Sequence, residues 1–223
     1  MLPWTIIDCA LTSDGTRLEL WRRGAEFSIR AAAGELMNSR THGSEQLLAR
    51  LAVDALGERT GPRVLVGGLG CGFTLAAALE LVGPAARVIV SEISPEVVGW
   101  NRTVLGELAR RPLDDPRVEV NVGDVAQQLA RQRAFDLILL DVDNGPSAFT
   151  RPDNAALYTR AGLSRLRAAL RVGGVLGVWS AGDDAEFSRR LRASDLQVTE
   201  HRVRAVQTGR GRRHWIWLAK RTG

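Results

Sequence analysis

The chain has 223 residues, of which 45% are apolar and 25% are charged, and its formal net charge is +5. The apolar fraction excludes a disordered chain, and no apolar run approaches the ~20 residues that a membrane-spanning helix needs. Basic charge can indicate nucleic-acid binding. However, Lys220 is the single lysine and the arginines are spread along the whole chain, as on a solvated surface, so nucleic-acid binding is not expected.

The first residues, 1–5, lack a basic segment followed by an apolar stretch, so no secretory signal is expected. The two cysteines, Cys9 and Cys71, are too few for a disulfide framework and lack the spacing of a zinc site. We therefore expect a reduced, cytoplasmic protein without a metal site.

The N-terminal segment alternates apolar and polar residues over 4–37, and Asp14-Gly15 is a hairpin signal between two such runs. This pattern predicts a small antiparallel β unit, which we place at residues 1–43. A helix is expected next, from about Ser44 to Leu56, with Ser44 as its cap and leucines along one face.

From about residue 64 onward, short apolar runs alternate with longer segments of helical spacing. The predicted strands are 64–66, 88–90, 118–120, 135–140 and 175–179, and the predicted helices are 74–81, 95–108 and 154–170, with a short helix after Asp183. Two further β-like stretches, 196–206 and 214–219, predict a closing antiparallel pair around Gly209-Arg210-Gly211. This alternation predicts one α/β domain over 44–223, with a doubly wound, mostly parallel, seven-stranded Rossmann-like sheet.

A glycine-rich turn, Gly68-Leu69-Gly70-Cys71-Gly72, follows the first parallel strand and precedes a helix. Glycines at this place let the backbone approach a ligand, and the helix N-terminus offers unpaired N–H groups. A phenylalanine follows where the third glycine of a dinucleotide fingerprint would stand, which favours a nucleoside-type ligand without a pyrophosphate. A tight strand–helix turn without a ligand is the alternative.

Two acidic residues follow the next two strands. Glu92 ends the second strand, where a carboxylate can accept both ribose hydroxyls of an adenosine. Asp124 follows the third strand, where it could accept a hydrogen bond from an adenine amino group. The alternative for each is an acid that serves only the start of the next helix.

Asp141 ends the most apolar strand, and Asp143 and Asn144 follow it before the Gly145-Pro146 turn. The ligand crevice of an open α/β sheet lies at the carboxyl ends of the strands. We therefore expect Asp141 to orient a nucleophile or to act as a general base, and Asp143 and Asn144 to add to substrate recognition. Capping of the turn is the alternative.

Three more side chains are candidates for the substrate pocket. Glu45 could line it with Asp141, although a glutamate in the first turn of a helix also suits the helix dipole. His42 is a candidate acid–base group, and Trp179 is the tryptophan expected to reach the crevice. The sequence shows no Ser-His-Asp triad and no phosphate-binding loop motif.

Taken together, these motifs resemble those of the class I S-adenosylmethionine-dependent transferases, the methyltransferase superfamily. The resemblance lies in the glycine turn, in Glu92, in Gly123-Asp124 and in the run 135–141. Within the superfamily the chain is most similar to the spermidine synthase (aminopropyltransferase) branch, well over about residues 60–180 and loosely over the first 60.

The resemblance implies a Rossmann-like methyltransferase fold that binds S-adenosylmethionine or its decarboxylated form. The glycine turn and Glu92 would hold the amino-acid and ribose parts of the cofactor, Asp124 would hold the adenine, and Asp141 would lie beside the attacking amine. A homodimer is also implied. The implied cofactor-binding residues are Gly68, Gly70, Gly72, Glu92, Ile93, Asp124, Val125 and Asp141.

The chain departs from the spermidine synthase pattern at positions suited to a diamine. Gly43-Ser44-Glu45 stands where that branch has Tyr-His-Glu, Asn144 replaces a second Asp, and Cys71 replaces an Asp that helps to bind the aminopropyl-bearing sulfonium. A dicationic substrate favours the lost charges. The sequence therefore favours a methyltransferase acting on a small-molecule acceptor, an amine or another nucleophile. Aminopropyl transfer is the alternative, and a non-catalytic, RNA-associated protein is a third hypothesis.

Overall fold

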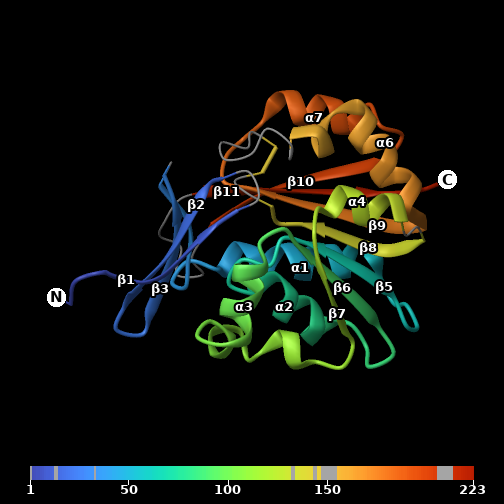
Figure 1. Cartoon of the computed structure of the whole chain (residues 1–223). Coiled ribbons are helices and arrows are strands. Elements are labelled where there is room, and N and C mark those ends of the chain that lie inside the picture. The colour runs from blue at the N-terminus through green and yellow to red at the C-terminus, as the bar shows by residue number, and fades with distance from the viewer. Residues whose placement is uncertain are drawn as a thin grey trace.

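The computed structural model of the chain describes residues 2–12, 15–32, 34–131, 134–142, 145–146, 155–204 and 213–223. Its strands form two sheets, one of four strands and one of seven. Figure 1 shows the four-stranded sheet projecting from one end of the seven-stranded α/β unit. The described part of the chain contains no helix that is both long and apolar enough to cross a membrane.

The smaller sheet is antiparallel and contains the first four strands in chain order. These strands are β1 (Thr5–Leu11), β2 (Arg17–Arg23), β3 (Glu26–Ala31) and β4 (Gly34–Asn38). Alternation of apolar and polar residues gives the sheet one buried face, on which Leu20 and Ile29 pack into the same core as the helices of the larger unit. The predicted N-terminal β unit is confirmed as antiparallel, and the Asp14 of its predicted hairpin lies outside the described residues.

The larger sheet has the strand order β10-β11-β9-β8-β5-β6-β7, in which the last five are parallel and the first two form the antiparallel edge. Its strands are β5 (Arg63–Gly67), β6 (Arg87–Glu92), β7 (Val118–Val122), β8 (Phe135–Leu140), β9 (Leu170–Ser180), β10 (Gln197–Arg204) and β11 (Arg213–Lys220). Every residue of the central strand β8 is buried, as a strand covered on both faces requires. The predicted doubly wound, mostly parallel, seven-stranded sheet is confirmed.

Helices cover both faces of this sheet (Figure 1). One face carries α1 (Gly43–Leu56), α2 (Phe73–Leu81) and α3 (Pro95–Arg102), and the other carries α4 (Val125–Arg131), α6 (Arg160–Ala169) and α7 (Ala185–Arg192). Short 3-10 turns occur at Gly106–Ala109, Pro112–Asp114 and Ala156–Tyr158.

Two predicted helices are shorter than the sequence pattern indicated. The helix predicted over 95–108 ends at Arg102, because the backbone at Thr103 leaves the helical region with φ −121° and ψ −104°, and the chain then turns through Gly106 as a 3-10 helix. In the described part of the helix predicted over 154–170, α6 starts only at Arg160, after Thr159 caps it through the Gly162 amide.

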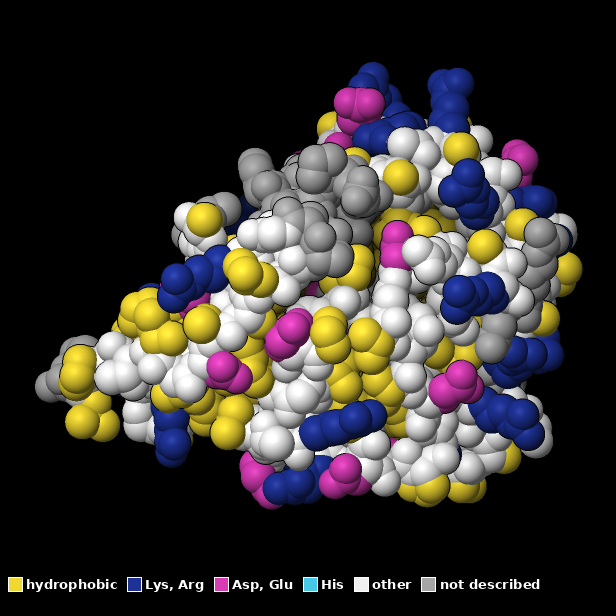
Figure 2. Space-filling model, in the orientation of Figure 1, with side chains coloured by type: hydrophobic (Ala, Val, Ile, Leu, Met, Phe, Trp, Pro, Cys, Tyr) yellow, Lys and Arg dark blue, Asp and Glu magenta, His cyan; other side chains and the backbone are white. Residues whose placement is uncertain are grey.

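The four-stranded sheet is also held to α3 by a polar contact. The indole Nε1–H of Trp100, which is 4% exposed, donates to Oδ2 of Asp8 on β1 at 2.7 Å. On the surface, basic side chains are scattered among acidic and neutral ones over the face shown in Figure 2. The smaller sheet thus packs at one end of the larger unit, and the face in Figure 2 has no continuous basic stripe.

Candidate active site

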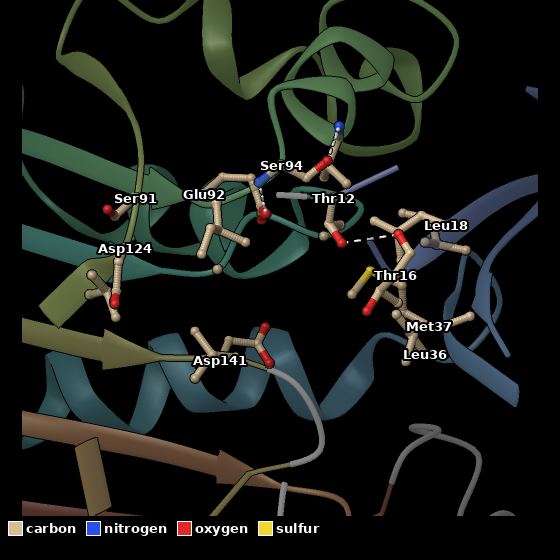
Figure 3. A pocket seen from close by; sticks show the side chains of 18 of the residues that line it. Thr12, Thr16, Leu18, Leu36, Met37, Ser91, Glu92, Ser94, Asp124 and Asp141 are labelled. Carbon is tan, nitrogen blue, oxygen red and sulfur yellow. Dashed lines mark hydrogen bonds between the residues drawn. The ribbon is translucent and has the colours of Figure 1, made fainter. Parts of the chain in front are cut away.

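A pocket lies where the carboxyl ends of β5, β6, β7 and β8 meet the buried face of the four-stranded sheet. Glu92 and Asp124 line one part of it, Asp141 another, and Leu36 and Met37 of β4 close it from the smaller sheet (Figure 3). The position at the carboxyl ends of parallel strands is the expected one for a ligand in this class of fold. The contribution of the smaller sheet was not predicted.

The glycine turn is shaped by close backbone contacts. Gly68 has a φ of +88°, and a Cβ at this position would collide with the carbonyl oxygen of Asp141. Gly70 has a φ of +54°, and its Cβ would lie 2.5 Å from Sδ of Met37. Both glycines line the pocket, whereas Gly72 lies behind the turn, at the N-terminus of α2 and against Asn101.

Glu92 joins the glycine turn to the end of β6. One carboxylate oxygen accepts from the Leu69 amide and the other from the Ser94 amide, each at 2.9 Å. Burial raises the pKa of Glu92 above its usual value, against the lowering effect of these backbone donors. Glu92 therefore holds the glycine turn to the end of β6 and also lines the pocket, and its binding of a ribose stays a prediction.

Asp124 has the capping role that the sequence left open as an alternative, and its binding of an adenine stays a prediction. Its Oδ1 accepts from the Ala126 amide at 2.7 Å, which fixes the start of α4. Together with Ile93 and Val125, it also lines the pocket. These three residues give the pocket one carboxylate and two apolar side chains on the same side.

Asp141 lies at the end of β8 and borders the pocket opposite Glu92 (Figure 3). The Thr74 hydroxyl of α2 donates to Oδ2 of Asp141 at 2.5 Å. Burial raises the pKa of Asp141 to about 6, although the hydrogen bond from Thr74 opposes the rise. Asp143 and Asn144 lie outside the described residues.

Glu45, in the first turn of α1, is electrostatically coupled to Asp141. Burial raises the pKa of Glu45 to about 7, and the charge of Asp141 adds to the rise. The hydroxyl of Ser44 donates to Oε2 of Glu45 at 2.5 Å and lies 2.8 Å from Nδ1 of His214 on β11. The predicted cap role of Ser44 is wrong, because α1 starts at Gly43 and the Ser44 hydroxyl faces this cluster instead.

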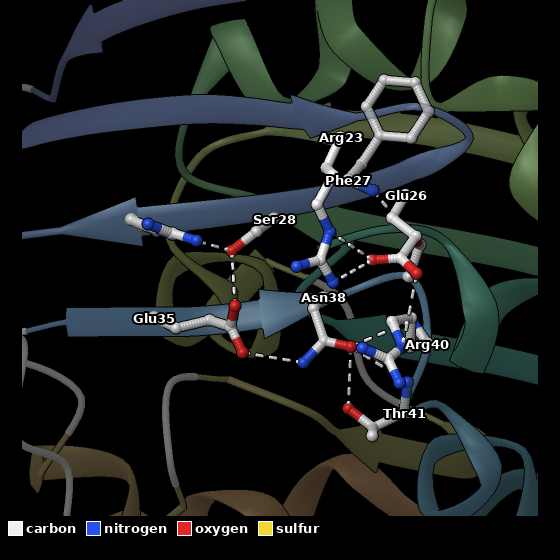
Figure 4. Close-up of polar contacts among 10 residues, drawn as sticks. Arg23, Glu26, Phe27, Ser28, Glu35, Asn38, Arg40 and Thr41 are labelled. Carbon is white, nitrogen blue, oxygen red and sulfur yellow. Dashed lines mark hydrogen bonds and ion pairs between the residues drawn. The ribbon is translucent and has the colours of Figure 1, made fainter. Parts of the chain in front are cut away.

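Polar contacts between β3, β4 and the following turn lead the chain into α1 (Figure 4). The side-chain oxygen of Asn38 accepts from the amides of Arg40 and Thr41 and from the Thr41 hydroxyl. The side-chain NH₂ group of Asn38 donates to the carboxylate of Glu35, which also accepts from the Ser28 hydroxyl. This network fixes the turn that delivers the first residues of α1 to the site.

The thiol of Cys71 lies among acidic groups. Burial, followed by the charges of Glu45, Asp141 and Glu35, raises its pKa to about 12. The thiol is therefore neutral at ordinary pH and adds no negative charge to the site.

The two remaining candidates occupy different places. His42 stacks on Phe73 with ring centroids 4.1 Å apart and borders a separate hollow between α1 and α2, not the main pocket. Trp179 does not line the main pocket either, but its ring meets His214 edge-on at 4.8 Å. Its buried indole N–H has no hydrogen-bond partner among the described residues.

Several groups at the site were not identified from sequence. They are the partners Ser44, Thr74 and His214, and the pocket-lining residues Leu36 and Met37. Ser44 and His214 lie 170 residues apart, and no local pattern relates them. Only the sheet pairing that brings β11 beside β9 places them together.

The chain has partial sequence similarity to two groups of transferases, an aminopropyltransferase and methyltransferases. No protein-family model matches it. It is 34% identical over 95 residues to a polyamine aminopropyltransferase from Nitrosomonas europaea, covering 41% of this chain and 27% of the relative. It is 32% identical over 91 residues to protein-L-isoaspartate O-methyltransferase 2 from Archaeoglobus fulgidus, covering 41% of this chain and 39% of the relative. The aligned part thus spans well under half of each relative.

Solved structures give the fold over nearly the whole chain. Spermidine synthase from Thermotoga maritima superimposes with a TM-score of 0.72 at 19% identity, over 98% of this chain and 73% of that one. A spermidine synthase in complex with the transition-state analogue AdoDATO gives the same TM-score at 18% identity, over 98% of this chain and 72% of that one. The predicted resemblance is confirmed for the fold, which is spermidine synthase-like, and the relatives in both groups are transferases.

Proposed function

We propose that the chain is a transferase that uses S-adenosylmethionine or a close relative of it and alkylates a small amine. The observation that carries this proposal is a pocket lined by three carboxyl groups, Glu92, Asp124 and Asp141. Glu45 does not line this pocket, but its pKa is raised by the charge of Asp141, so a second half-buried carboxyl group lies behind Asp141. Paired carboxyl groups suit an amine that binds as a cation and reacts after losing a proton.

The residues of the pocket fit a sulfonium nucleoside. Glu92 offers carboxylate oxygens to ribose hydroxyls, Asp124 offers one to an adenine amino group, and Ile93 and Val125 give the base an apolar contact. Such a cofactor supplies a carbon atom bonded to a positively charged sulfur, which a neutral nitrogen can attack. The protein's own contribution is to bind the acceptor at Asp141, orient its nitrogen and exclude water beneath the four-stranded sheet.

Methyl transfer is the first form of this proposal. The neutral Cys71 thiol supports it, because the spermidine synthase pattern has an acid at this position to bind a charged aminopropyl group. Aminopropyl transfer is the second form. The four-stranded sheet supports it, because the fold likeness to spermidine synthases extends over 98% of the chain and includes this sheet.

Calorimetry with S-adenosylmethionine, its decarboxylated form and methylthioadenosine tests the proposal and separates its two forms. We expect micromolar binding of at least one sulfonium donor. Tighter binding of the decarboxylated donor would contradict methyl transfer, and no binding of any of the three ligands would contradict the proposal as a whole.

Replacing the carboxylate beside the acceptor tests the catalytic assignment. Asp141→Asn is expected to lower the transfer rate by about 10²- to 10⁴-fold while donor affinity changes only a few-fold. Asp54→Asn, an exposed position on α1, is the matched control. Equal rates in the two variants would show that Asp141 does not act on the acceptor.

A further inference from the structure

The main pocket has two ends that differ in chemistry. One end carries the carboxyl groups of Glu92 and Asp124, where the nucleoside is proposed to bind. The other end, called the apolar end below, is formed by side chains of the four-stranded sheet: Leu18, Ile29, Ala31, Leu36 and Met37. In the view of Figure 3, Asp124 and the Leu36–Met37 pair lie on opposite sides, and Asp141 lies between them. A molecule with its nitrogen at Asp141 can therefore extend its other atoms into the apolar end.

A β-bulge in β4 contributes two neighbouring side chains to the apolar end. Successive side chains of a regular strand point to opposite faces of the sheet. The register of β3 and β4 places Met37 opposite Ile29. It places Glu35 opposite Arg30, so Leu36 has no residue opposite to it on β3. Such a bulge changes the direction of side chains and is common beside active sites. Leu36 and Met37 accordingly both line the pocket, although they are adjacent in sequence.

The four-stranded sheet adds no charged side chain to the described lining of the pocket. Glu35, next to the bulge, does not line the pocket and accepts hydrogen bonds from Ser28 and Asn38 instead. The hydroxyl of Thr12, at the edge of the apolar end, donates to the carbonyl of Thr16 at 3.0 Å. An ammonium group placed here would lose its water without gaining a carboxylate, which is strongly unfavourable.

We infer that the acceptor is a monoamine whose nitrogen lies at Asp141 and whose apolar group lies in the apolar end. This inference rests on the proposed function and names the class of amine that it acts on. Each CH₂ group that is buried in the apolar end increases affinity by about 4-fold. The single positive charge of the acceptor stays beside the carboxyl group of Asp141, and a diamine is disfavoured because its second charge would enter the apolar end.

A matched pair of amines tests this inference on the unaltered chain. Hexylamine and 1,5-diaminopentane have the same number of non-hydrogen atoms, and a methyl group in the first replaces an ammonium group in the second. In calorimetry on the protein saturated with methylthioadenosine, we expect hexylamine to bind about 10-fold more tightly or better. Affinity is also expected to rise by about 4-fold for each CH₂ group from butylamine to hexylamine. Equal affinities for the matched pair, or tighter binding of the diamine, would overturn the inference.

A carboxylate placed in the apolar end should reverse this preference. Leu36→Asp is expected to weaken binding of hexylamine and to tighten binding of the diamine, each by about 10-fold. Leu36→Asn has nearly the same shape without the charge, so it is expected to weaken hexylamine binding and to leave the diamine unchanged. Ile6→Asp is the matched control, because it adds the same charge to the same sheet at an exposed position of β1 outside the pocket. A control that shifts the preference as much as Leu36→Asp does would overturn the inference.

The outcomes separate this inference from the proposed function. If Leu36→Asp changes the affinity for methylthioadenosine and leaves the affinities for both amines unchanged, the apolar end holds part of the donor, and the inference is overturned while the proposed function stands. The kcat/KM values for the matched pair, measured with the sulfonium donor that binds, are expected to show the same preference as the affinities. An absence of binding of every donor and of methylthioadenosine would contradict the proposed function itself.

Discussion

At the scale of single residues, the unusual feature is the burial of two carboxyl groups that interact with each other. Transfer of a carboxylate out of water disfavours its charged form, and a neighbouring negative charge disfavours it further. Ser44 and Thr74 each donate one hydrogen bond, to Glu45 and Asp141 respectively, and this offsets only part of the cost. The pair therefore lowers the free energy of unfolding of the chain. Such a loss of stability is common at functional sites.

This cost gives a stability prediction with a definite sign. The pKa of Glu45 rises from 4.5 to about 7 on folding, so protonation of Glu45 favours the folded chain. This contribution to the free energy of unfolding is fully present below pH 4.5 and is lost as the pH rises towards 7. Glu45→Gln removes this loss. We expect the variant to exceed the wild type in free energy of unfolding by roughly 1–3 kcal/mol at pH 8, and the difference to shrink towards pH 4.5.

Denaturant unfolding at pH 4.5, 6 and 8 measures this difference. Glu58→Gln, an exposed glutamate just after α1, is the matched control and is expected to show no such trend. A Glu45→Gln variant that is less stable than the wild type at pH 8 would mean that the carboxylate is stabilised in the folded chain, contrary to the raised pKa.

At the scale of elements, Met37 of β4 packs against the glycine turn of the larger unit. A Cβ at Gly70 would lie 2.5 Å from the Met37 sulfur, and the backbone at Gly70 has a positive φ of +54°. The four-stranded sheet thus lies directly against the turn that would hold the cofactor. Sequence patterns indicated each element but not this contact.

A methyl group added at Gly70 tests the contact. Gly70→Ala is expected to destabilise the chain by roughly 1–3 kcal/mol, because alanine is strained at this positive φ, and to weaken methylthioadenosine binding at least 10-fold, since the end of the Met37 side chain, which lines the pocket, must move. Gly83→Ala is the matched control, because a Cβ there meets no atom within 4 Å. Met37→Ala in the Gly70→Ala background is expected to recover part of the loss, and a double variant no better than Gly70→Ala would contradict a steric cause. Calorimetry and thermal unfolding measure both effects.

The sequence predicted the elements well where the signal is local. The buried strand β8 and the glycine turn before α2 follow from apolar runs and turn residues, and each is present as expected. The helix after Pro95 was predicted too long, because apolar spacing did not indicate that the backbone leaves the helical region at Thr103. Local signals extend over one or two turns of chain, and errors of this kind fall at their ends.

The candidate site was predictable only in part, for a related reason. Glu92, Asp124 and Asp141 each end or follow a parallel strand, so strand prediction alone placed them at one edge of the sheet. His214 reaches the site through antiparallel pairing at the sheet edge, and Met37 reaches it through packing between the sheets. Contacts of both kinds depend on tertiary structure and leave no spacing in the sequence.

At the scale of the whole molecule, a basic chain carries an acidic site. The formal net charge is +5, and the described pocket and its neighbours contain Glu92, Asp124, Asp141 and Glu45. On the face in Figure 2, arginines are interspersed with acidic side chains and form no continuous patch. A cationic acceptor would thus be attracted locally, by the pocket, while the surface as a whole repels it weakly.

The same distribution predicts weak binding to nucleic acid. A protein that neutralises several phosphates shows a log–log dependence of affinity on salt with a slope near −0.9 per phosphate on duplex DNA and near −0.7 on single strands. Because the arginines are dispersed along the sequence and lie among acidic side chains on the face in Figure 2, we expect a slope no steeper than about −2 on single-stranded RNA. Fluorescence anisotropy with labelled RNA between about 50 and 200 mM salt measures it. A slope of about −4 or steeper, with no binding of a sulfonium nucleoside, would favour an RNA-associated protein over a transferase.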